Sequence, residues 1–88
     1  MLTEMVEKAR AFLRGRRIAY NQVFNPNTPD GALVLKDLAK FCRAHGSTFN
    51  ADSRVHAILE GRREVWLRIQ NHLNLTEDQL WELYGKGN

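Results

Sequence analysis

Apolar residues recur three or four positions apart along almost the whole chain, and this spacing limits the fold more than any other feature. It matches the 3.6-residue turn of an α-helix, whereas a half-buried strand needs strict alternation, which no segment shows. Four stretches carry the helical pattern, at about 3–24, 29–45, 52–73 and 77–84. The sequence therefore predicts an all-α domain of four helices, three main ones and a short C-terminal one.

Helix-breaking residues separate these stretches, and several of them carry capping signals. The segment NPNTPD ends the first helix because proline disfavours helical backbone in the residue before it. Thr28 is placed to cap the second helix, with Pro29 at its first position, and Gly46 is a natural terminator. Thr76 and Gln79 have the spacing of a capping box, which predicts the start of the fourth helix.

Length and composition indicate one helical domain over residues 1–88, with a frayed tail at 85–88. Hydrophobic residues make up 43% of the chain and charged residues 26%, which is ordinary for a soluble globular domain. Cys42 is the only cysteine, so we expect no internal disulfide and a reducing compartment. No apolar run approaches membrane-spanning length, and no leader pattern precedes the domain, so no membrane partner is expected.

The net charge of +3 is unevenly distributed. Residues 1–24 carry five cations against two carboxylates, whereas residues 76–88 carry one cation against three carboxylates. A basic first helix permits an anionic partner, and nucleic acid is one alternative. The basic cluster is mild and lies in no helix-turn-helix or zinc-finger pattern, so nucleic acid is not favoured. The candidate binding arginines on this helix are Arg10, Arg14, Arg16 and Arg17.

The motif GRR occurs twice, in LRGRRIAY at 13–20 and in LEGRREVW at 59–66. Three interpretations are open: an internal duplication, a shared phosphate-binding surface, or two helices with similar packing needs. The flanking sequences differ, which argues against duplication. Arg62 falls on the apolar stripe of the third helix, where an arginine needs an acidic side chain, a helix end or a partner. We favour packing, with Gly61 and Arg62 as structural residues and Arg63 as a candidate binding residue.

No residue pattern supplies catalysis or metal binding. The chain has no HExxH motif, P-loop or His/Cys cluster and no nucleophile paired with a base, so we expect no enzymatic activity, cofactor or metal. Trp81 and Tyr84 lie three apart on the short helix, where they either dock it to the core or present an anchor to a partner. Phe49 is expected to pin a loop to the core, and Cys42 to act as a small hydrophobe. The expected core residues are Phe12, Leu35, Leu38, Phe41, Cys42, Phe49, Ile58, Val65, Trp66 and Ile69.

Several short motifs occur together between Tyr20 and Ile69: YNQVF, GALVLKDLAKFC, STF and EGRREVWLRI. In this combination the chain resembles a family of small tailed-phage proteins, typified by the nineteenth gene product of a Bordetella phage. The resemblance implies a phage or prophage source, with genes for head, portal and packaging proteins nearby, and it brings no catalytic residues. It defines a family-like core over residues 20–75 and leaves residues 1–19 as a basic N-terminal helix extension.

These observations predict a small non-enzymatic phage protein that acts through protein contacts in virion assembly or genome packaging. An early host-takeover protein that binds and inhibits a host protein is one alternative. A nucleic-acid-binding accessory protein that uses the first helix is another. A long first helix on so small a domain also suggests a homodimer, because pairing covers an exposed apolar stripe. The expected location is the host cytoplasm, with association to the virion left open.

Overall fold

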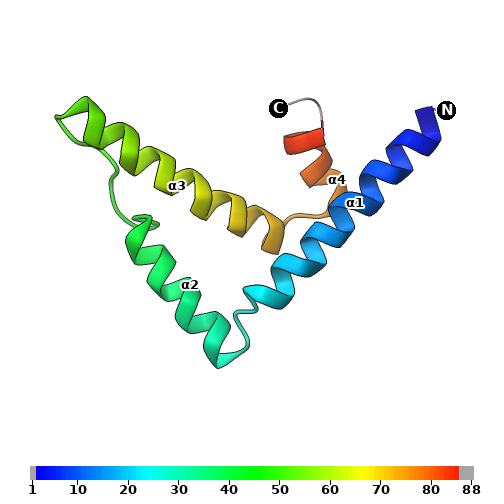
Figure 1. The fold of residues 1–88 in the computed structure, drawn as a ribbon, viewed down its shortest axis with the longest axis horizontal. Helices are drawn as coiled ribbons and strands as arrows, with labels where there is room; N and C mark the ends of the chain where they lie inside the picture. The colour runs from blue at the N-terminus through cyan, green and yellow to red at the C-terminus, as the bar shows by residue number, and fades with distance from the viewer. Residues whose placement is uncertain (1, 86–88) are drawn as a thin grey trace.

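The computed structural model describes residues 2–85, and no strand occurs among them. The helices are α1 (Leu2–Val23), α2 (Pro29–Phe41), α3 (Ser53–Asn74) and α4 (Glu77–Leu80), and α4 continues into the π-helical turn η1 (Trp81–Gly85). This confirms the predicted all-α fold of three main helices and a short C-terminal one (Figure 1). Apart from Gly85, the predicted frayed tail at 85–88 lies outside the described residues.

Local capping explains where most of these helices begin. The Thr28 hydroxyl accepts a hydrogen bond from the Gly31 N–H at 3.0 Å, which confirms the predicted cap of α2. The Asp52 carboxylate caps α3 in the same way. Thr76 and Gln79 form the predicted capping box at the start of α4. Each cap satisfies backbone donors that have no partner within the helix.

The end of α2 differs from the prediction, because the helix stops at Phe41 and does not reach Gly46. Arg43 adopts a left-handed backbone with φ of 52°, and the Ala44 N–H donates to the Ala39 carbonyl at 2.8 Å. This is the Schellman arrangement, in which glycine is the usual left-handed residue. Because an arginine stands where glycine is usual, the sequence gives no indication that the helix ends here.

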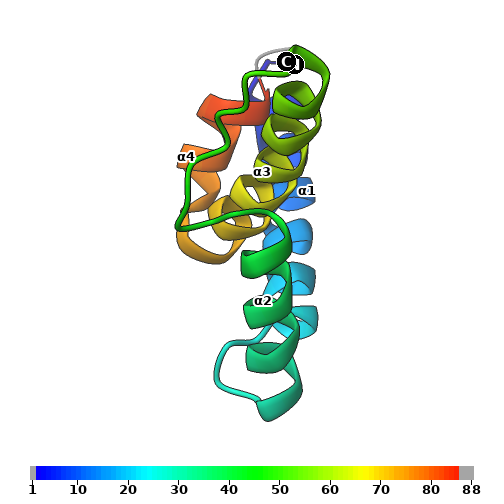
Figure 2. The same ribbon diagram turned by 90° about the vertical axis from the view of Figure 1, so that its left-hand side faces the viewer.

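The helices form an open, flat plate. α1 and α3 make the two arms of a V and pack against each other near its point, α2 contacts α3 on the outside of the V, and α4 lies beside α1 (Figure 1). The plate is thin when it is viewed edge-on (Figure 2), and its Cα extents are 50 × 34 × 13 Å. The radius of gyration is 15.6 Å, whereas a compact chain of this length has about 12 Å.

The plate exposes more surface than a compact fold does. Its accessible surface is 6695 Å², whereas a folded monomer of this size exposes about 5,300 Å². Many of the exposed side chains are large and apolar. The described chain therefore leaves uncovered a surface of the kind that proteins use for association.

The thin plate also explains why the core is smaller than predicted. The buried apolar side chains are Leu13, Cys42, Leu59, Ile69 and Leu80. Of the predicted core, Cys42 and Ile69 are buried, and the half-buried residues are Leu35, Leu38 and Trp66. The prediction is wrong for five residues, each of which is more than half exposed: Phe12, Phe41, Phe49, Ile58 and Val65.

Candidate functional site

The EGRR motif clamps the connection between α2 and α3. The Glu60 carboxylate accepts a hydrogen bond from the hydroxyl of Thr48, which is buried. The Arg63 guanidinium donates to the carbonyls of Arg43 at 3.0 Å and Gly46 at 2.9 Å, just beyond the end of α2. His56 contributes a ring nitrogen 3.0 Å from the Thr48 carbonyl. Side chains of α3 therefore supply hydrogen-bond partners to the irregular segment that follows the end of α2.

The two arginines of this motif differ from their predicted roles. Arg62 was expected to meet an acidic side chain, a helix end or a partner, but its guanidinium stacks over the Phe41 ring at 4.4 Å from the centroid. Arg63, predicted as a binding residue, makes the bonds at the end of α2. Gly61 is exposed, and a methyl group there would contact nothing within 4 Å. It is therefore not a site of close helix approach, which corrects its predicted packing role.

Phe49 does not pin the α2–α3 connection as predicted. Its side chain is 73% exposed and only approaches the His56 ring at 6.0 Å. The neighbouring Thr48 instead attaches the α2–α3 connection to α3 through its hydrogen bond to Glu60. Cys42 is buried as a free thiol, in agreement with its predicted role as a small hydrophobe.

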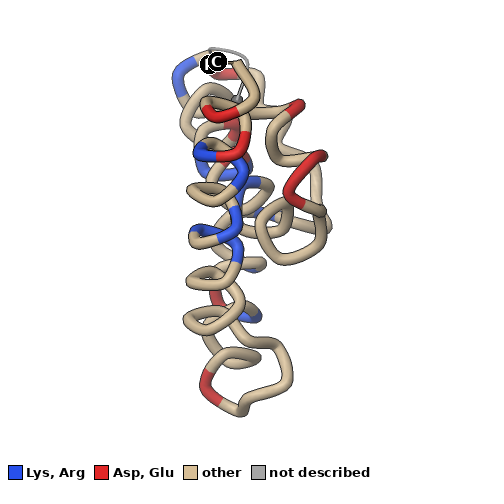
Figure 3. The backbone as a smooth tube through the Cα atoms, turned by 90° about the vertical axis from the view of Figure 1, so that its right-hand side faces the viewer, with Lys and Arg blue, Asp and Glu red and all other residues tan. Residues whose placement is uncertain are grey.

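The first GRR motif lies in a different environment, beside α4. Glu77 accepts from the Arg14 guanidinium at 2.9 and 3.1 Å and from Arg17 at 3.3 Å. Arg10 pairs with Asp78 at 3.2 Å. Figure 3 shows the cationic positions of α1 in a column, with the acidic positions of α4 beside it. Three of the four predicted binding arginines of α1 thus attach the C-terminal helix.

Within this cluster, the pKa values of Glu77 and Arg14 are shifted. The hydrogen bond from Arg14 is the largest influence on the Glu77 carboxyl and lowers its pKa. Desolvation opposes this and raises the pKa, and the positive charges of Arg14, Arg17 and Arg10 lower it further. The hydrogen bond and the charge of Glu77 raise the pKa of the Arg14 guanidinium. Both shifts favour the ionised pair, so the contact between α1 and α4 is strongest when Glu77 is charged.

Arg16, the remaining arginine of the cluster, stacks over the Phe12 ring at 4.6 Å. The two motifs therefore follow one plan: the first arginine of each pair stacks on an aromatic ring, and the second bonds to oxygen acceptors. They do so on different elements, since Arg62 and Arg63 contact the end of α2 while Arg17 contacts α4. Among the described residues, no hydrogen bond, ion pair or ring contact joins the two pairs into the shared phosphate-binding surface that the sequence left open.

Arg16 also lines a cavity of about 250 Å³ between α1, α3 and η1. Trp81 and Tyr84, the predicted anchors, form its η1 wall, and Arg68 of α3 lies over the Tyr84 ring at 4.7 Å. We call this the aromatic–arginine pocket, lined by Ala9, Phe12, Leu13, Arg16, Arg68, His72, Trp81 and Tyr84. Neither Arg16 nor Arg68 has an ion pair with a carboxylate among the described residues. The pocket therefore combines apolar walls with two guanidiniums.

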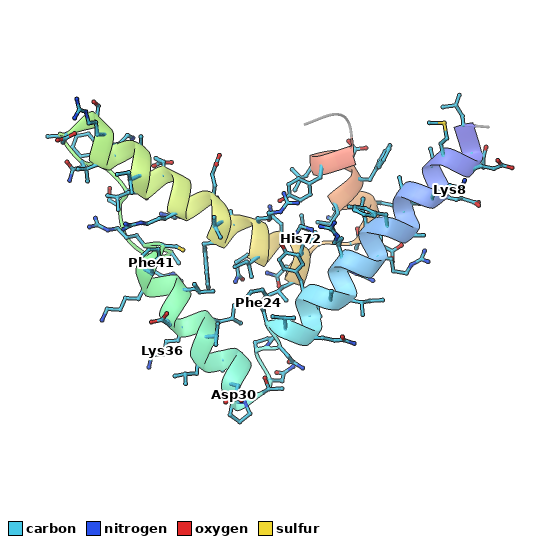
Figure 4. All side chains as sticks on the ribbon, viewed as in Figure 1. Lys8, Phe24, Asp30, Lys36, Phe41 and His72 are labelled. Carbon is cyan, nitrogen blue, oxygen red and sulfur yellow. The ribbon has the colours of Figure 1, made fainter. Side chains whose placement is uncertain are left out.

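The floor of this pocket is His72, which is 1% exposed. Its ring is stacked between Tyr20, at 4.2 Å between centroids, and Tyr84, at 5.5 Å. Its Nδ1 lies 2.8 Å from the Arg68 carbonyl, and because a carbonyl only accepts, Nδ1 donates. Figure 4 labels His72 at the point where α3 meets α1 and the C-terminal turn. The stack fixes the relative positions of the three elements that form the pocket.

The structure therefore gathers Arg16, Trp81 and Tyr84 of the predicted binding residues in one place, and it leaves Arg63 at the clamp. Sequence inspection missed Arg68 and His72. A signal for His72 was present, since it lies three residues after the buried Ile69 on one helix face. Arg68 offered none, because its role depends on where η1 folds back.

The comparison with protein families identifies the class of protein. A family model described as Bbp19-like phage protein matches residues 20–84. The match spans about three quarters of the chain and runs through α4 and η1, so the chain belongs to this family of phage proteins. Residues 2–19 of α1 lie outside it. Neither a search of curated proteins nor a search of solved structures gave a match.

Two further observations concern the described part of the chain. Across residues 2–85, no helix has both the length and the apolar character needed to cross a bilayer. Within the same range, no three His, Cys, Asp or Glu side chains are grouped so that they could hold a metal ion.

Proposed function

We propose that this phage protein is not an enzyme and acts through contacts with other proteins during virion assembly or genome packaging, within the host cytoplasm. One observation supports the proposal most directly. The plate exposes about 1,400 Å² more than a compact monomer, and a standard protein interface buries about 1,200–2,000 Å² in total. A partner that covers the plate would supply burial that the short chain cannot supply alone.

The use of the family's polar residues also supports a role in contacts rather than chemistry. Glu60, Arg62 and Arg63 all engage groups of the same chain at the clamp. They are therefore committed to holding α2 and α3 in the plate. A plate whose own contacts already fix these helices loses less order on binding, which suits it to receive partners.

Host takeover by inhibition of a host protein would use the same exposed surface, so expression timing separates the two functions. We expect the transcript to appear late in infection, together with the head and packaging genes. An early transcript, combined with one host protein captured at a stoichiometric level by the tagged chain, would replace assembly with host takeover.

Nucleic-acid binding by the basic helix receives less support. Arg10, Arg14 and Arg17 are paired with carboxylates of α4, which reduces the charge available to phosphates. A protein that makes several phosphate contacts loses affinity steeply as salt rises. We expect no such salt-dependent binding to DNA or RNA fragments at low salt, and a steep salt dependence would favour this alternative.

A further inference from the structure

The aromatic–arginine pocket holds two positive charges that no acidic side chain offsets. Arg16 and Arg68 both line it, and none of the described residues around it is an aspartate or a glutamate. Glu64 precedes Arg68 by one turn of α3, but these two residues form no ion pair. A cavity lined by charge of one sign attracts a ligand of the opposite charge.

Both guanidiniums are positioned by stacking, which leaves their N–H groups available. Arg16 lies over the Phe12 ring at 4.6 Å from its centroid, and Arg68 lies over Tyr84 at 4.7 Å. Stacking uses the flat face of a guanidinium, whereas its N–H donors point outward in the plane. Among the described residues, neither side chain has a hydrogen-bond acceptor. Planar donors of this kind match the two oxygens of a carboxylate.

The buried His72 adds a hydrogen-bond acceptor to the same cavity. Its Nδ1 donates to the Arg68 carbonyl, so Nε2 of the neutral ring is an acceptor, and no described residue donates to it. No fully buried side-chain nitrogen or oxygen of the described chain lacks a partner. The 1% of His72 that remains exposed therefore includes Nε2, and His72 lines the cavity.

The size and the walls of the cavity limit what can enter it. Its volume is about 250 Å³, below the roughly 300–1,000 Å³ of small-molecule sites. Phe12, Trp81 and Tyr84 give it aromatic walls. An occupant that fits is about one residue in size and carries both an apolar group and a carboxylate. In a protein, only the C-terminal residue has an apolar side chain and a carboxylate on the same Cα.

We propose that the aromatic–arginine pocket binds the C-terminal residue of a partner protein, and that this residue is apolar. Its side chain lies against the aromatic walls, its carboxylate accepts from Arg16 and Arg68, and its backbone N–H donates to Nε2 of His72. Capture of a chain end through its carboxylate is a recurring mode of peptide recognition. The inference rests on the proposed function, since it names the chemistry that holds a partner protein.

An NMR titration of the isotope-labelled full chain with a short peptide is the first test. The probe is acetyl-glycyl-glycyl-phenylalanine with a free C-terminus, and the control is its C-terminal amide, which lacks the charge. The chain has two tryptophans, of which Trp81 lines the pocket and Trp66 does not. We expect the acid to shift the indole signal of Trp81 alone. The amide should bind at least about tenfold more weakly, because hydrogen bonds to a charged group contribute more than neutral ones.

Arginine variants locate the bound carboxylate. Arg16→Gln and Arg68→Gln each remove one guanidinium, and we expect each to weaken binding of the acid at least about fivefold and to change binding of the amide little. The matched control is Arg54→Gln, because Arg54 is also exposed, lies on α3 and has no ion pair among the described residues. Exposed charges contribute little to stability, so circular dichroism should show the same fold in all three variants.

Several results would overturn the proposal: no shift of the Trp81 indole at millimolar peptide, equal affinity for acid and amide, or an equal loss in Arg54→Gln. Tighter binding of an amidated peptide with its carboxylate on a glutamate side chain would also do so, and would assign the pocket to an acidic side chain of a partner. Tighter binding of a nucleoside monophosphate would assign it to nucleic acid.

The outcome is separable from the proposed role in virion assembly. A pocket that binds none of these probes leaves the exposed surface of the plate available to partners. Equally, absence of the chain from phage particles would remove that role and leave the preference of the pocket for a terminal carboxylate intact.

Discussion

Gly31 occupies a position where the backbone of the preceding turn leaves no space for a side chain. A methyl group there would lie 1.9 Å from the Asn25 carbonyl oxygen and 2.6 Å from the Thr28 hydroxyl. That carbonyl accepts from both the N–H and the hydroxyl of Thr28, so it cannot move without loss of the cap. Glycine at this position therefore lets α1 turn tightly into α2.

Substitution of this glycine tests that reading. We expect Gly31→Ala to lower the free energy of unfolding by about 1–3 kcal/mol, the usual cost of overpacking. Gly61→Ala is the control, because a methyl group there meets nothing, and it should raise stability by about 0.5–1 kcal/mol through helix propensity. Thermal or urea unfolding measures both. Equal effects of the same sign would contradict the close approach at Gly31.

The two arginines of the EGRR motif provide a second comparison. Arg63→Ala removes two hydrogen bonds from a charged donor to carbonyls beyond α2, and we expect a loss of about 1–3 kcal/mol in unfolding free energy. Arg62→Ala removes one cation–π contact with the exposed Phe41, for which about 0.5–1 kcal/mol is typical. Urea unfolding of both variants in one buffer decides the order. A costlier Arg62 would restore the role that the sequence had suggested for it.

The residue roles were only partly predictable from the sequence, and the two arginines show why. The sequence placed Arg62 on the apolar stripe of the third helix, and in the structure its guanidinium contacts Phe41 of α2. Which of two adjacent arginines meets carbonyls depends on where α2 ends. That end is set by a left-handed Arg43, a conformation that sequence rules assign to glycine or asparagine.

At the scale of elements, three ion pairs hold α4 to α1, and two of them include Glu77. Its pKa is lowered in the folded chain, chiefly by the hydrogen bond from Arg14. A depressed carboxyl pKa gives stability that is fully present above the unfolded value, about 4.3 for glutamate. This stability is lost as the pH falls through the lower folded value.

Comparison of the wild type with Glu77→Gln isolates this effect, because the other carboxyl groups are common to both. We expect the wild type to be the more stable at pH 7 and the difference to be smaller at about pH 3, below the ordinary carboxyl range. Chemical unfolding at the two pH values measures the difference. A difference that is unchanged or larger in acid would show that Glu77 is not stabilised as the ionised partner of Arg14.

The starts of α2 and α4 were well predicted because their causes are local. The Thr28 cap and the Thr76–Gln79 box lie within a few residues of the helices they start, so the sequence contains the whole signal. The attachment of α4 was not predicted, although the opposite charges at the two ends of the chain were visible. A net charge indicates attraction, but it does not say which arginines meet Glu77.

At the scale of the whole molecule, an apolar stripe predicted the buried face of each helix only where another element covers it. Ile58 and Val65 fit the stripe of α3, but they lie exposed beside the buried Leu59 and Ile69. A three-layered fold would have covered them, whereas this chain folds as a thin plate. Periodicity gives the direction of an apolar face, and whether the same chain or a partner covers it is a property of the assembly.

Particle composition is the most direct test of the proposal that this phage protein works by contact with other phage proteins. Quantitative mass spectrometry of procapsids and mature virions, purified from late lysates, should find the chain at a fixed ratio to a head or packaging protein. The matched sample is a phage carrying Met5→Glu and Val65→Glu, which charge two uncovered faces and should lower that ratio severalfold, by analogy with interface substitutions. A chain absent from both kinds of particle would contradict the account.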